Sequence, residues 1–147
     1  MNGHQPLGLN AAWASIMELL GPMEERLFGP GPDDLTFATN QYTMLYTRVY
    51  LIYIQKPPFN LAPDLYRRLG IHIADVAREA FANNKQKHMD VYANRIKHIF
   101  KPIQSSERSY VRRLGLPLVE DVVRAAFRTA ASVEMEIGAT FVIPQRR

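Results

Sequence analysis

Apolar residues recur along this chain at intervals of three and four positions, the spacing that places them on one face of an α-helix. Glycine and proline interrupt the pattern, because proline cannot continue a helix interior and glycine suits turns and helix ends. The segment 29–35, Gly-Pro-Gly-Pro-Asp-Asp-Leu, is a loop on this chemistry alone. The pattern predicts an all-α bundle of five or six helices joined by short connections.

The same breaks predict where the helices of the first two thirds begin and end. Asn10 is expected to cap the first helix, and Gly21-Pro22 is expected to kink or break it. Three further helices are expected at about 40–55, 63–82 and 87–100.

Two more helices are predicted toward the end of the chain. Ser105 or Ser106 is expected to cap a short helix that contains Tyr110, and Pro117 opens the last helix, which Gly138 ends. The expected organisation is a polar lead over 1–9, a helical domain over 10–137 and a tail over 138–147.

The second predicted helix has an unusual surface pattern. Four of the seven tyrosines recur there at offsets of four, four and three residues, at Tyr42, Tyr46, Tyr50 and Tyr53. An aliphatic stripe adjoins them, and Arg48 is the only charge. The run 49–54 taken alone is typical of a buried strand, but the tyrosine spacing favours a helix. Such a helix is either core or interface, because tyrosine also serves as a rigid anchor in interfaces.

The amino-acid composition excludes several classes of function for this chain. A length of 147 residues suits one domain, and the absence of cysteine excludes disulfides and predicts a reducing intracellular compartment. The longest uninterrupted apolar run, 49–54, is far shorter than the roughly 20 residues that cross a bilayer. The net charge is +4 and the pI is near 9.5, but the basic residues are scattered along the sequence, which disfavours nucleic-acid binding.

Residues capable of catalysis form no recognisable motif. The four histidines are too dispersed for a helical zinc site, and no glycine-rich phosphate loop is present. Acidic pairs such as Glu24-Glu25 are expected to be solvated charge. The sequence therefore predicts no enzyme, no cofactor and no metal.

Several segments resemble the N-terminal repeat of the cullin family, closest to the plant cullins of F-box ligases. The string 41–50, Gln-Tyr-Thr-Met-Leu-Tyr-Thr-Arg-Val-Tyr, and the following Gln-Lys-Pro-Pro at 55–58 are similar to the second cullin helix and its turn. Further matches occur in the same order at Trp13, Leu65-Tyr66, Glu107–Val111, Leu116-Pro117 and Phe127-Arg128.

This resemblance implies a cullin-repeat fold and a place in ubiquitin-dependent protein catabolism, in the cytoplasm and nucleus. In that family a Skp-type adaptor, which carries F-box proteins, docks on the second and fifth helices. The residues implied in docking are Tyr42, Thr43, Tyr46, Val49, Tyr50, Ser109, Tyr110 and Val111.

The chain also departs from a full cullin. The segment after Ala82 is shorter, and 104–106 is inserted before the fifth helix. The region that recruits a RING protein and the lysine that accepts a ubiquitin-like modifier are missing, so the chain is expected to compete with full cullins for the adaptor. The alternatives are a helical module for another partner, self-association as a homodimer, and a basic nucleic-acid-binding domain.

Overall fold

The computed structural model describes residues 7–55 and 60–145, with side chains described as far as residue 135. Within these ranges the chain forms six α-helices, two short 3₁₀ helices and no strand, so the predicted all-α class is confirmed. In chain order the helices are α1 (Leu9–Phe28), α2 (Thr39–Tyr53), α3 (Ala62–Ala82), η1 (Gln86–His88), α4 (Met89–Ile99), η2 (Lys101–Ile103), α5 (Tyr110–Arg113) and α6 (Val119–Gln145).

The ends of α3 illustrate how local sequence sets helix limits. Pro63 and Asp64 lie in its first turn, where proline loses no intrahelical hydrogen bond and a carboxylate faces the positive end of the helix dipole. The helix ends at Ala82, and Asn84 then takes a left-handed backbone conformation with φ 57°. Asparagine tolerates that conformation better than most residues, so the chain can turn there.

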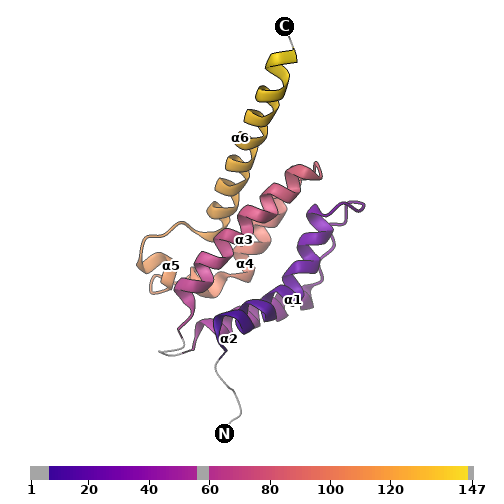
Figure 1. Ribbon diagram of the computed structural model, residues 1–147. Helices are drawn as coiled ribbons and strands as arrows, with labels where there is room; N and C mark the ends of the chain where they lie inside the picture. The colour runs from indigo at the N-terminus through magenta and orange to yellow at the C-terminus, as the bar shows by residue number, and fades with distance from the viewer. Residues whose placement is uncertain (1–6, 56–59, 146–147) are drawn as a thin grey trace.

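The first helix departs from prediction at its start, and of the kink or break expected at Gly21-Pro22, no break occurs. Gly8, not Asn10, precedes the first helical residue. The helix continues through Pro22, which removes one hydrogen bond but does not end the element, and Figure 1 shows the ribbon changing direction along its length.

Three predictions about the last two helices are wrong. Neither Ser105 nor Ser106 lies at the N-cap of α5; Ser109 occupies that position without a side-chain capping hydrogen bond, and α5 is a single turn of four residues. Gly138 does not end α6, which runs to Gln145, so no separate tail begins at 138. Glycine inside a helix costs only about 1 kcal/mol relative to alanine, which is too little to stop a helix already formed.

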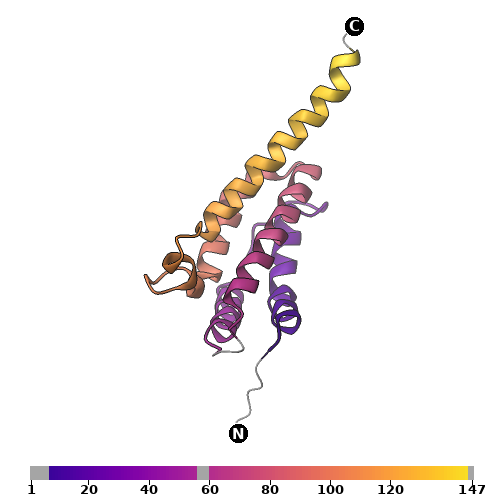
Figure 2. The same ribbon diagram turned by 60° about the vertical axis from the view of Figure 1, so that its left-hand side comes forward.

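The helices pack around α3, α4 and the first half of α6. The last helix lies against α3 and α4, while α1 packs on α2 and α3. Figures 1 and 2 show the second half of α6 extending past the other helices. Helix α2 lies at the opposite end, against α1, α4 and η2.

The core draws large side chains from every α-helix except α5, which contributes only Val111. Phe28 is its aromatic centre, with its ring 5.2 Å from Tyr92 and 5.6 Å from Phe127. These three rings join α1, α4 and α6, and edge-on or tilted ring pairs of this kind add about 1 kcal/mol each beyond simple burial.

Candidate protein-docking surface

The inner face of α2 belongs to the core. Leu45, Val49 and Ile52 are at most 2% exposed, and each buried aliphatic side chain stabilises the fold by about 2 kcal/mol. Val49, a predicted docking residue, therefore cannot touch a partner. Its position follows from helix geometry, because 45, 49 and 52 share the face directed at α1 and α4.

The opposite side of α2 is apolar and exposed, and we call it the outer face. It consists of Asn40, Thr43, Met44, Tyr46, Thr47, Tyr50, Leu51 and the C-cap residue Ile54. The five large side chains in this set are 39% to 49% exposed. None of its residues carries a charge. Monomeric proteins rarely expose a contiguous apolar patch of more than a few hundred Å², so a face of this kind indicates an interaction site.

Tyr46 and Tyr50 are the aromatic centre of the outer face. Their rings lie 6.4 Å apart and are nearly parallel, with 5° between their planes. They are 39% and 44% exposed, and their hydroxyls have no hydrogen-bond partner among the described residues. Of the docking residues predicted on α2, Tyr46, Tyr50 and Thr43 are thus accessible.

The other two tyrosines of the stripe turn toward the bundle. Tyr42 is half-buried, 4.5 Å from the Phe37 ring and 6.5 Å from the His98 ring, and burial raises the pKa of its hydroxyl. The Tyr53 hydroxyl accepts the backbone N–H of Tyr110 at 3.1 Å. The predicted stripe is therefore split into two exposed rings and two that pack on neighbouring elements.

The predicted docking residues around α5 are mostly inaccessible. Ser109 is 3% exposed and its hydroxyl donates to the Ser106 carbonyl at 2.6 Å, while Val111 is fully buried. Only Tyr110 is half-exposed, with its ring 6.0 Å from that of Tyr66. Ser109 and Val111 are therefore inaccessible in this structure, because these two residues of the short α5 segment pack into the bundle.

The single charge of α2 points away from the outer face. The Arg48 guanidinium donates to the Ser15 carbonyl and to Glu18 Oε1, both at 2.6 Å and both on α1. These two hydrogen bonds hold α2 on α1. Because Arg48 is the only charged residue of α2, the outer face carries no charge.

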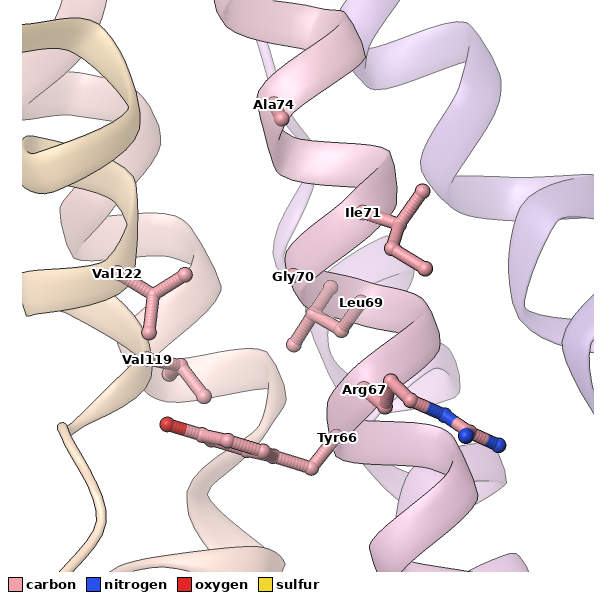
Figure 3. Close-up of a pocket in the computed structure, with 8 residues that line it drawn as sticks. All are labelled: Tyr66, Arg67, Leu69, Gly70, Ile71, Ala74, Val119 and Val122. Atoms are coloured by element: carbon pink, nitrogen blue, oxygen red, sulfur yellow. The ribbon is translucent and has the colours of Figure 1, made fainter. Parts of the chain in front are cut away.

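A separate groove runs between α3 and α6 (Figure 3). It holds about 390 Å³, and its lining is aliphatic apart from Tyr66 and Arg67. The Tyr66 hydroxyl donates to the Pro117 carbonyl at 2.7 Å, and Arg67 points away from α6 toward its ion-pair partner Asp64. No pair of polar groups converges in the groove, so it offers no acid, base or nucleophile for catalysis.

A buried polar cluster joins α1, α3 and α4. Glu24 is 7% exposed; its carboxylate accepts a hydrogen bond from the Tyr92 hydroxyl at 2.5 Å and lies 2.7 Å from His72 Nε2. Burial, reinforced by Glu24, raises the pKa of Tyr92 well above its ordinary value. The expectation that Glu24 is solvated is wrong. Its partners lie 48 and 68 residues away, so no local pattern could reveal them.

Other classes of site find no support within the described ranges. No group of three or more histidine, cysteine or acidic side chains is placed to hold a metal ion. No described helix is both long and apolar enough to span a membrane. No protein-family model, curated protein or solved structure matches the chain. The outer face of α2 is therefore the surface from which a function can be argued.

Proposed function

We propose that this chain is a helical docking module that binds a Skp-type adaptor, and through it F-box proteins, on the outer face of α2. The observation that carries the proposal is the uncharged, exposed apolar surface around Tyr46 and Tyr50. The class of partner comes from the resemblance of 41–50 to the second helix of a cullin repeat.

Docking would remove the apolar side chains of this face from water, and this desolvation would favour binding. Interfaces concentrate their binding energy in a few central residues, and tyrosine is among the commonest of them. The near-parallel rings of Tyr46 and Tyr50 present a broad surface, and Met44, Leu51 and Ile54 extend it with aliphatic area. Since α2 is fixed to α1 and α4 by its buried inner face, the partner meets a preformed surface.

The proposal also predicts a functional consequence. A full cullin and this chain would occupy the same adaptor surface, so their binding would be mutually exclusive. An excess of this chain over adaptor is then expected to slow transfer by a reconstituted cullin ligase.

Calorimetric titration of a Skp-type adaptor into the protein tests the proposal. We expect a 1:1 complex with a Kd in the micromolar range or tighter, corresponding to about 8 kcal/mol of binding free energy. Absence of heat and of co-elution on a sizing column at tens of micromolar adaptor would overturn it. If the protein alone forms a dimer at that concentration and the outer face becomes protected from hydrogen exchange, self-association is the better account.

A further inference from the structure

Cations outnumber carboxylates most clearly in one stretch of this protein. Residues 97–113 carry five lysine and arginine side chains and one carboxylate, Glu107, which makes a net charge of +4. The rest of the chain carries 13 cations and 13 carboxylates, which cancel. The whole formal net charge of +4 therefore resides in α4's last turn, η2, the following loop and α5.

The five cations of this stretch, which we call the basic strip, are all exposed. They are Lys97, Lys101, Arg108, Arg112 and Arg113. Arg112 Nε donates to the Gln104 carbonyl at 2.6 Å, and no cation of the strip forms an ion pair with a described residue.

Several exposed cations elsewhere do have carboxylate partners. Arg67 pairs with Asp64 at 2.9 Å, and Lys87 lies 3.3 Å from Asp33, where its hydrogen bond lowers the pKa of that carboxyl. The strip thus differs from these cations in lacking charge compensation within the described chain, and it concentrates a positive potential over a short distance.

The elements that carry the basic strip border the outer face of α2. Helix α2 packs directly against α4 and η2. The Tyr42 ring contacts His98 next to Lys97, and Tyr53 bonds to Tyr110, two residues before Arg112. Tyrosines 42 and 53 lie on the same side of α2 as Tyr46, so the elements that carry the strip lie along the aromatic side of the outer face. The opposite flank is α1, where Glu18 pairs with Arg48.

We propose that the partner of the outer face presents an apolar patch bordered by acidic side chains, which meet the basic strip and steer association. This inference rests on the proposed docking function and adds the charge of the partner's surface and its orientation. The hydroxyls of Tyr46 and Tyr50 can donate hydrogen bonds and, in an interface, need acceptors. Carboxylates on the partner would accept hydrogen bonds from both hydroxyls and would form ion pairs with the cations of the strip.

The arrangement favours an acidic protein surface over a nucleic acid. Single-stranded nucleic acids are bound where cations and aromatic rings alternate along one groove, so that phosphates and bases are held together. Here the two most exposed rings, Tyr46 and Tyr50, lie on α2, whereas the cations lie on α4, η2, α5 and the loop before α5. Tyr110 is the one half-exposed ring among the cations, so cations and rings do not alternate along a groove. An apolar face with a charged border matches the composition of protein interfaces.

Stopped-flow association with a Skp-type adaptor, at about 20 mM and about 300 mM salt, tests the proposal. Charge reversal in Lys101→Glu with Arg113→Glu is expected to slow association by about tenfold or more at low salt and by less than about threefold at high salt, with little change in dissociation rate. Arg67→Glu with Arg128→Glu makes the same change in net charge on exposed residues of α3 and α6 and is the matched control. A rate loss equal in both double variants would overturn the proposal.

Two outcomes separate this inference from the docking function. If Tyr46→Ala with Tyr50→Ala abolishes adaptor binding but the strip variant associates like wild type, the docking function stands and the acidic partner is wrong. If wild type does not bind the adaptor, the docking function is wrong. The inference about the charge of the partner is then tested by fluorescence anisotropy, which measures binding of the protein to a polyglutamate peptide and to a short DNA duplex. Peptide binding that the strip variant loses supports it; tighter binding to the duplex, or no binding to the peptide, overturns it.

Discussion

The outer face of α2 and the buried cluster around Glu24 are opposites: the first exposes apolar side chains to solvent, and the second buries a carboxylate. Glu24 places a carboxylate in the interior, and the chain surrounds it with Tyr92 and His72. The outer face leaves five large apolar side chains exposed, and the described chain covers none of them. The buried carboxylate of Glu24 has hydrogen-bond partners on two other helices, whereas the exposed apolar side chains of the outer face have no partner among the described residues.

The difference indicates which region is structural and which is functional. A buried carboxylate that accepts hydrogen bonds from two helices holds α1 against α3 and α4, and its inaccessibility excludes substrate. An exposed apolar face adds nothing to the stability of the monomer. Such a face lowers solubility, and the proposed docking partner would remove that cost by covering it.

Glu24→Ala is expected to have the largest effect on stability. It leaves the Tyr92 hydroxyl buried without an acceptor and removes the partner of His72, so the free energy of unfolding should fall by about 3 kcal/mol. Urea unfolding followed by circular dichroism measures the loss. Glu25→Ala removes the neighbouring, exposed carboxylate and should change stability by less than about 0.5 kcal/mol. Equal effects in the two variants would contradict a structural role for Glu24.

Tyr92→Phe gives a smaller effect that depends on pH. Because the folded-state pKa of Tyr92 is raised, the unfolded chain loses this proton near pH 10 while the folded chain keeps it. Wild-type stability therefore falls above pH 10, and the phenylalanine variant lacks this contribution. The gap between the two unfolding free energies should narrow by up to about 1.4 kcal/mol per pH unit there. A gap that stays constant from pH 8 to 11 would show that Tyr92 ionises equally in both states.

Sequence reasoning predicted the helices well where proline, glycine and periodicity agree. The limits of α3 follow from Pro63 and Asn83-Asn84, and α2 is helical despite its strand-like run at 49–54. Prediction was less accurate where a single residue had to end a helix. Gly138 lies inside α6, and Pro22, expected to kink or break α1, does not break it, because one unfavourable residue costs less than the favourable turns on either side contribute.

The docking surface was predictable only in part. The spacing of the tyrosines indicated that the second helix carries aromatic rings on its surface, but it could not show that the Tyr42 ring packs against Phe37 or that Tyr53 bonds to α5. Val49, Ser109 and Val111 were assigned by resemblance, and the packing of α2 and α5 buries them. The charge excess of residues 97–113 is present in the sequence, but only the fold brings the elements that carry it beside α2.

The most direct test of the account uses Tyr46→Ala combined with Tyr50→Ala on the outer face. Calorimetric titration with a Skp-type adaptor should show affinity reduced by about two orders of magnitude, since about 1.4 kcal/mol corresponds to tenfold. The melting temperature should stay close to that of wild type, because removing exposed rings leaves no cavity. Ile71→Ala, which truncates a 63% exposed apolar residue on α3, is the control and should leave both quantities unchanged. Unchanged affinity in a folded double variant would contradict the claim that this face is the docking surface.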